Sequence, residues 1–158
     1  MSFKIFLDTE FTDFIDTQLI SLGMVTDSGD TFYAEIPYMD DACSAFVREA
    51  VIPLLGQVPN SQYAVDDLGT KILTWLEIVH TGEQAVDVCF DYQTDWDLFS
   101  DVLEQRVPEW CRPRNVKREI SEVLRYEFHK NSQLPMHHAL FDALGNRYAF
   151  RERNSVDE

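Results

Sequence analysis

The pattern of apolar and polar residues predicts three short strands in the first quarter of the chain. Residues 4–8 form an apolar run that ends in a carboxylate, which is typical of a buried strand. Residues 19–26 are expected to form a second strand, and the turn residues 27–30 lead into a third at 31–36. Because short turns join these strands, we expect them to pair antiparallel.

Helical spacing dominates the rest of the chain. We expect helices at residues 42–51, 65–79, 96–103, 116–128 and 139–150, with a fourth strand at 85–90 between the second and third helices. Asp40 or Asp41 is expected to cap the first helix and Asn115 the fourth, while Pro53 and Pro108 limit the first and third helices.

The order of these elements predicts the fold class. The expected order is three strands, two helices, one strand and three helices, with one more short strand near Trp110. This order indicates an α/β sandwich with a mixed sheet. The chain has no internal repeat, low-complexity tract or linker, so we expect a single domain at residues 1–153 and a polar tail at 154–158.

Composition is consistent with one globular domain. The 158 residues are 45% hydrophobic and 13% aromatic, which is enough apolar mass for a real core. No apolar run approaches the roughly 18 residues of a membrane span, and the N-terminus does not read as a signal peptide, so we expect a cytoplasmic protein with no membrane partner. Cys43, Cys89 and Cys111 form no CxxC pair and predict free thiols.

The net charge of -15 argues at first against a nucleic-acid partner. The distribution is uneven, because ten of the 13 Lys and Arg residues lie at or after Arg106, together with only eight of the 28 acids. Two interpretations remain open. The basic residues could belong to a solvated helix face, or they could guide an anionic ligand.

Asp8 and Glu10 are two residues apart in the first strand, so the pleat places both side chains on one face. Carboxylates this close repel each other unless a cation lies between them, which makes them a candidate metal site. Phe11 and Phe14 follow and could stack a terminal base. Solvated acids and core phenylalanines are the simpler alternatives.

Two more clusters contain candidate functional residues. Asp91, Asp95 and Asp97 lie where the fourth strand leads into a helix, and ligand sites in open sheets often form at such strand ends. We favour Asp95 as the site residue, with Asp91 and Asp97 as alternatives. Helix capping is a further explanation for one of these acids. Near the C-terminus, His137 and His138 precede Asp142, and direct metal binding by the histidines lacks a companion motif.

The three clusters together resemble the DEDDh 3′-to-5′ exonuclease superfamily, which includes the polymerase proofreading subunit, ribonuclease T and oligoribonuclease. The resemblance lies in Phe6-Leu7-Asp8-Thr9-Glu10-Phe11, in Thr94-Asp95-Trp96-Asp97-Leu98-Phe99 and in His137-His138-Ala139-Leu140-Phe141-Asp142-Ala143. Two features depart from the family. Its usual Asn-Ala before the middle acid is replaced by Tyr92-Gln93-Thr94, and the histidine is doubled; family spacing selects His137, whereas helical spacing would pair His138 with Asp142.

The resemblance implies a ribonuclease H-like fold and hydrolysis of a nucleic-acid 3′ end to nucleoside 5′-monophosphates with two Mg²⁺ or Mn²⁺ ions, which oxygen ligands favour over Zn²⁺. The implied catalytic groups are Asp8, Glu10, Asp95, His137 and Asp142, of which the four acids bind metal and His137 is the general base. Thr9, Phe11 and Phe14 are the implied substrate-binding residues.

The implied partner is the 3′ end of a single-stranded nucleic acid, RNA in preference to DNA. A homodimer is possible for this family. A small-nucleotide phosphodiesterase and a non-catalytic interaction domain of the same fold are the rival hypotheses.

Overall fold

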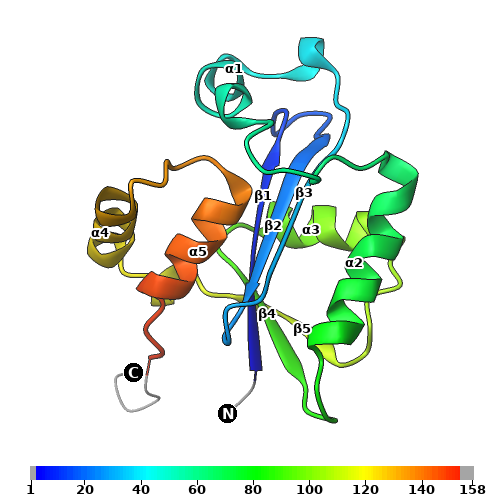
Figure 1. Ribbon diagram of the computed structural model, residues 1–158, viewed down its shortest axis with the longest axis vertical. Helices are drawn as coiled ribbons and strands as arrows, with labels where there is room; N and C mark the ends of the chain where they lie inside the picture. Colours follow the sequence, from blue (N-terminus) through cyan, green and yellow to red (C-terminus); the bar gives the residue numbers. More distant parts are fainter. Residues whose placement is uncertain (1–2, 154–158) are drawn as a thin grey trace.

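A five-stranded mixed sheet forms the centre of the computed structural model, which describes residues 3–153 (Figure 1). The strand order is β3-β2-β1-β4-β5. β2 is antiparallel to both β1 and β3, whereas β4 is parallel to both β1 and β5. The strands are β1 (Phe3–Phe11), β2 (Leu19–Thr26), β3 (Thr31–Glu35), β4 (Val86–Phe90) and β5 (Cys111–Asn115). The expected mixed sheet and the strand after Trp110 are confirmed; the expected tail at 154–158 lies outside the described residues.

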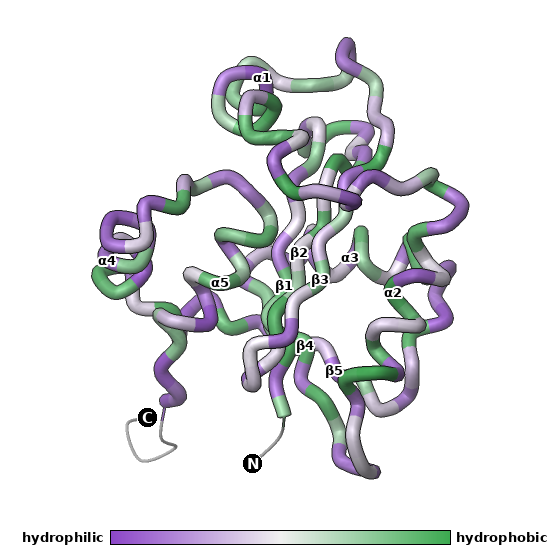
Figure 2. The backbone as a smooth tube through the Cα atoms, in the orientation of Figure 1, coloured by the Kyte–Doolittle hydropathy of each residue, from purple (hydrophilic) through white to green (hydrophobic). Residues whose placement is uncertain are grey.

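Helices cover both faces of this sheet. The α-helices are α1 (Ala45–Ala50), α2 (Val65–Val79), α3 (Gln93–Val102), α4 (Glu122–Ser132) and α5 (Ala139–Ala149), and the 3₁₀ turns are η1 (Asp40–Ala42), η2 (Ile52–Leu54) and η3 (Lys117–Glu119). α2 and α3 lie on one side of the sheet, α5 and α4 lie on the other, and α1 lies beyond one end (Figure 1). Hydrophobic and hydrophilic residues alternate along α2 and α4, as expected for helices with one buried side (Figure 2).

The alternation of side chains along β1 decides which face of the sheet carries the acids. Ile5 and Leu7 are fully buried in the core that includes α2 and α3, whereas Phe6 packs in the cluster that includes Ala143 of α5. Asp8 and Glu10 continue the series of Phe6 and therefore project toward α5. They lie inside β1, which runs on to Phe11, and not at the end of a strand that stops at Asp8.

Gly23 allows α5 to lie directly against the sheet. It pairs with Asp8 across β1 and β2, and a Cβ at this position would lie 2.5 Å from the Leu140 nitrogen and 2.6 Å from the Ala139 oxygen. Real Cβ atoms do not approach backbone this closely, so only glycine fits. The first turn of α5, which carries Asp142, is thereby held close to the Asp8 strand.

The expected helix at 116–128 is wrong in its first six residues. Asn115 ends β5, and its side chain accepts a hydrogen bond from the Lys117 amide of the short turn η3, at 3.0 Å. Val116 and Ile120 are buried against the α5 side of the sheet, so the chain stays irregular there to bury both. The helix begins at Glu122, capped by Ser121, which accepts from the Leu124 amide at 3.3 Å.

Two other helix boundaries also differ from expectation. α1 is capped by Ser44, which accepts from the Val47 amide at 3.2 Å, while the two aspartates expected as caps lie in η1. α3 begins at Gln93, three residues before the expected start. It ends at Val102 where Glu104 and Gln105 take left-handed backbone angles, so Pro108 is not what ends it.

Two expectations from composition can be compared with the described residues. Cys43, Cys89 and Cys111 are buried and unpaired, so the expected free thiols are confirmed. Within residues 3–153, none of the helices combines the length and apolar character needed to cross a bilayer.

Candidate active site

One pocket of about 310 Å³ contains every site residue that the sequence predicts. β1, α3 and α5 contribute to it, together with α1, α4 and the segment that precedes α5. The lining residues are Asp8, Thr9, Glu10, Phe11, Phe14, Phe46, Asp91, Tyr92, Asp95, Arg125, Met136, His137, Asp142 and Asn146. Side chains that are far apart in the sequence are therefore brought to one place by the fold.

Potential metal ligands within this pocket form two groups. Glu10, His137 and Asp142 each offer a ligand atom, and these atoms lie within 4.8 Å of one another. The same limit holds for Asp8, Asp91 and Asp95. The pocket thus holds five carboxylates and one imidazole, a set dominated by the oxygen ligands that Mg²⁺ and Mn²⁺ prefer.

The position of Asp95 is fixed by β1. Thr9 donates to Asp95 Oδ1 both from its hydroxyl, at 2.6 Å, and from its amide, at 3.3 Å, while the Tyr92 amide donates to Oδ2 at 3.4 Å. Both donors of Thr9 are engaged by Asp95, so Thr9 orients this carboxylate; its contact with substrate stays a prediction. Asp97 is exposed and outside the pocket, where it accepts a hydrogen bond from Gln93.

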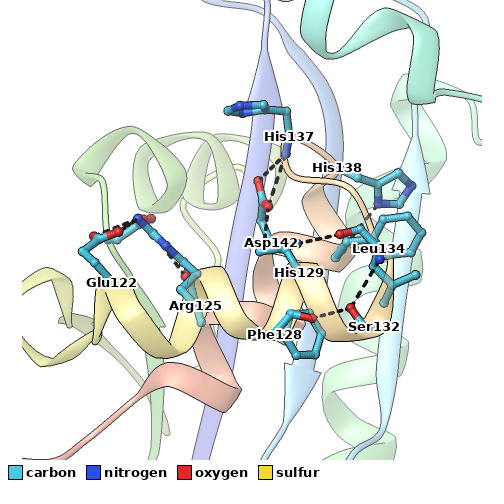
Figure 3. Close-up of polar contacts among 12 residues, drawn as sticks. Glu122, Arg125, Phe128, His129, Ser132, Leu134, His137, His138 and Asp142 are labelled. Atoms are coloured by element: carbon cyan, nitrogen blue, oxygen red, sulfur yellow. Dashed lines mark hydrogen bonds and ion pairs between the residues drawn. The ribbon is translucent and has the colours of Figure 1, made fainter.

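Asp91 shares the site with Asp95 and is paired with a residue that sequence reasoning missed. Arg125 of α4 lies 3.4 Å from Asp91 and 3.4 Å from the Asn146 amide oxygen of α5, and its other nitrogen contacts Glu122 at 2.6 Å (Figure 3). Arg125 and Asn146 belong to no motif. The only sequence signal was the excess of basic residues after Arg106, which did not single out either residue.

The two neighbouring histidines have different environments (Figure 3). His137 lines the pocket, and its amide donates to Asp142 Oδ2 and Oδ1 at 3.0 and 3.3 Å. His138 is 2% exposed and stacks on Tyr33 and Phe141, with ring centroids 4.5 and 3.8 Å away. Its Nδ1 accepts from the Phe141 amide at 3.5 Å and caps α5. His138 therefore belongs to the core.

His137 also adopts an uncommon backbone conformation. Its φ of 68° lies in the left-handed region, which residues other than glycine rarely occupy. The hydrogen bonds from its amide to Asp142 and the edge-on contact of its ring with Phe46, at 4.9 Å, hold this conformation. Strained residues cluster at functional sites, which is consistent with a role for His137.

His129 supports Asp142 from behind the pocket. Its Nδ1 lies 2.8 Å from the Leu134 carbonyl, and its Nε2 lies 3.5 Å from Asp142 Oδ1 (Figure 3). The contact requires a glycine on α5, because a Cβ at Gly145 would lie 2.8 Å from His129 Nε2. Nothing in the sequence pattern identified His129, which sits on the inner side of an ordinary amphipathic helix.

The electrostatics of the pocket are those of crowded, buried acids. Burial is the largest cause of each shift, and neighbouring carboxylates add to it, so that the pKa is raised to about 9 for Glu10, about 8 for Asp95 and about 7 for Asp142, and is raised for Asp8 as well. Asp8 Oδ2 and Asp91 Oδ1 are buried and lack a hydrogen-bond partner among the described residues. A divalent cation would satisfy both features, so this set of residues fits a metal site.

The histidines have the opposite shift. Burial, with a contribution from His129, lowers the pKa of His137 below its ordinary value, and burial lowers that of His138 to about 4. Near neutral pH the His137 imidazole is therefore neutral and able to accept a proton.

Solved structures that are similar to this chain include nucleases. The nuclease domain of 3'hExo, a DEDDh family member, bound to rAMP aligns over 97% of this chain and 96% of its own, with 13% identity and a TM-score of 0.57. Cell-death related nuclease 4 (CRN-4) aligns over 93% of this chain and 62% of its own, with 13% identity and a TM-score of 0.59. A 3'-exonuclease structure on 3'-end specific recognition of a histone mRNA stem-loop aligns over 92% and 61%, with 12% identity and a TM-score of 0.59.

The chain has the ribonuclease H-like fold that the resemblance implied. It spans less than two thirds of the length of two of these three neighbours. No protein-family model and no curated protein matches the sequence.

Proposed function

We propose that this protein is a metal-dependent 3′-to-5′ exonuclease that releases nucleoside 5′-monophosphates from single-stranded nucleic acid, with RNA as the preferred substrate. One observation carries the proposal. Two carboxylates of β1, one of α3, one of α5 and the imidazole before α5 line a single pocket in the order and spacing of the DEDDh motifs. An exonuclease fold supports the same conclusion.

The acids are proposed to bind two divalent cations. Asp8, Glu10, Asp95 and Asp142 would hold them, and Asp91 is a fifth carboxylate within reach of the Asp8 and Asp95 group. When bound, two such ions activate a water and stabilise the leaving oxygen of a phosphodiester. Thr9 and the Tyr92 amide keep Asp95 in its orientation, so less of the carboxylate's freedom must be lost on binding.

His137 is proposed to accept the proton of the attacking water. Its neutral state near pH 7 follows from burial, and its imidazole offers a nitrogen within 4.8 Å of ligand atoms of Glu10 and Asp142. The amide bonds to Asp142 fix the backbone from which the imidazole projects.

The terminal nucleotide is proposed to stack on the aromatic side of the pocket. Phe14 is 71% exposed, which is unusual for a phenylalanine in a folded protein, and it packs edge-on against Phe11 with ring centroids 5.1 Å apart. An exposed phenylalanine that rests on a half-buried one in the lining of this pocket suits base stacking.

A metal titration on end-labelled single strands tests the proposal. With Mg²⁺ or Mn²⁺ present, a 5′-labelled strand should shorten one nucleotide at a time, while a 3′-labelled strand should release labelled mononucleotide at once; EDTA should abolish both. Parallel RNA and DNA strands of one sequence test the preference. Release of mononucleotide from the 5′ end, or unchanged hydrolysis in EDTA, would refute the assignment.

A further inference from the structure

A second cavity lies beside the active-site pocket and is lined mainly by cationic side chains. It measures about 510 Å³ and is lined by Asn115, Lys117, Arg118, Glu119 and Arg153, which we call the basic groove. These residues come from the end of β5, from η3 and from the segment after α5. The sequence left two interpretations of the basic residues in this half of the chain open, a solvated helix face or a surface that guides an anionic ligand.

The charge of the basic groove is positive in spite of its one acid. Glu119 is already paired with Arg114, at 3.0 Å, and it also accepts a hydrogen bond from the Arg153 amide. Within residues 3–153, no carboxylate forms an ion pair with the side chains of Lys117, Arg118 or Arg153. By contrast, ion pairs engage Arg106, Arg112, Arg114 and Arg125.

Lys117 joins the basic groove to the active-site pocket. Its Nζ lies 4.9 Å from the ring centroid of Tyr92, a cation–π contact, and Tyr92 also lines the pocket. The Tyr92 side chain is 52% exposed, so this junction is open to a ligand. The contact therefore places a lining residue of the basic groove against a lining residue of the active-site pocket.

The charge elsewhere would repel such a chain. The first 105 residues hold three basic residues and twenty acids. Phosphate binding depends on Lys and Arg, and a strand leaving an acidic pocket would be drawn to adjacent unpaired cations.

We propose that the basic groove binds the phosphates of the single strand that lie 5′ to the nucleotide in the active-site pocket, with Tyr92 and Lys117 at the junction. The inference rests on the proposed exonuclease function and deepens it, because it makes the substrate a polymer and not a free dinucleotide. A solvated surface with no ligand is the alternative, and it predicts no dependence on strand length.

Binding measurements test the groove independently of catalysis. The Asp8→Asn variant, in which hydrolysis is disabled, would be titrated against a fluorescein-labelled single strand of about 12 nucleotides in Mg²⁺ buffer, with fluorescence anisotropy as the readout. Adding Lys117→Gln and Arg118→Gln should weaken binding at least about tenfold at low salt and should reduce the slope of log K against log salt by about 1.4.

The matched control neutralises two exposed basic residues on the other side of the sheet. Lys71→Gln with Arg106→Gln makes the same change in net charge near α2 and α3. It should leave the affinity within about twofold and the salt slope unchanged, since a contact-specific effect does not follow net charge. Equal losses of affinity in both double variants, or no loss in either, would overturn the proposal that the basic groove binds the strand.

Hydrolysis assays on proteins that keep Asp8 distinguish failure of the groove proposal from failure of the proposed exonuclease function. The ratio of kcat/KM for the long strand to kcat/KM for a dinucleotide should fall at least about tenfold in the Lys117→Gln, Arg118→Gln variant. If both substrates are cleaved with an unchanged ratio, the groove is wrong and the exonuclease stands. If neither is cleaved, the function is wrong and the binding result alone decides the groove.

Discussion

The Asp8 carboxylate is buried, has one oxygen without a hydrogen-bond partner, and lies among other acids that raise its pKa. Such an arrangement destabilises the folded protein unless a cation is bound. Residues of this kind are where stability and function are expected to conflict. The spacing of Asp8 and Glu10 made them candidates, because the pleat of a strand fixes which side chains share a face, and the resemblance to the exonuclease motifs selected them.

Replacing Asp8 with Asn should stabilise the metal-free protein and eliminate hydrolysis. In EDTA the free energy of unfolding should rise, because the unfavourable burial of an ionisable carboxyl among other acids is removed. Chemical denaturation in EDTA and a nuclease assay in Mg²⁺ would measure the two effects. Asp97→Asn, at an exposed position outside the pocket, is the control and should change neither. A destabilised but active Asp8→Asn protein would contradict the assignment.

The two histidines should separate by the kind of damage that their loss causes. His137→Ala should lower kcat by about 10²- to 10⁴-fold with little change in stability, because a general base is lost. His138→Ala should lower stability by removing the cap of α5 and the stacking with Tyr33 and Phe141. Steady-state kinetics and thermal melts would distinguish them. Near-normal turnover in His137→Ala would reject it as the base.

His138 should also make stability depend on pH. Its pKa is about 4 in the folded protein and near 6.5 when unfolded, so between these values the unfolded chain binds more protons and folding weakens as pH falls. The difference in unfolding free energy between wild type and His138→Asn should shrink from pH 7 to pH 4.5. A difference that is constant over this range would contradict the buried, neutral histidine.

Among the elements, α5 has the greatest influence on the site, because it carries Asp142 and rests on β2 through a glycine. The 3.6-residue period predicted this helix almost to the residue, since its buried positions form a regular stripe. The start of α4 was not predictable from local pattern. Val116 and Ile120 look helical by spacing, but their burial in the sheet core keeps them out of a helix.

Gly23→Ala should reduce both stability and activity, because the new methyl group meets the backbone of α5 at 2.5 Å and pushes its first turn from the sheet. A loss of about 1–3 kcal/mol is expected. Gly69→Ala is the matched control, since its Cβ would lie 2.7 Å from the Val102 carbonyl between α2 and α3, away from the site. It should lower stability while leaving kcat of the folded protein unchanged. Equal activity in both variants would contradict the role of Gly23.

For the whole molecule, the order of elements predicted the mixed sheet, and the three motifs that carry the resemblance pointed to residues that line one pocket. What local sequence could not show are the side chains that approach from neighbouring helices. Arg125 and His129 reach the acids only through the packing of α4 on α5. Their partners lie 34 and 13 positions away in the chain, and nothing in their own segment marks them.

The intact protein should be stabilised by metal in a pH-dependent way. Because the pKa values of these acids are raised from about 4 in the unfolded chain to about 7 to 9 in the folded protein, the stability of the metal-free protein falls as pH rises from about 4 and levels off above about 9. Metal binds the ionised form, so Mg²⁺ or Mn²⁺ should raise Tm more at pH 8 than at pH 6. At a metal concentration a hundred times the Kd that applies at pH 8, the stabilisation at that pH should be about 2.7 kcal/mol. An equal shift at both pH values would argue against these acids as the ligands.

The backbone amide of His137 donates hydrogen bonds to the carboxylate of Asp142, so the positions of the proposed base and of a proposed metal ligand depend on each other. Without this acceptor, the unfavourable left-handed backbone conformation of His137 is no longer stabilised, and the imidazole loses its fixed position. Combining His137→Ala with Asp142→Ala, which removes the acceptor, should therefore cost far less than the product of the two separate losses in kcat. Selection acting on either position would be constrained by the other.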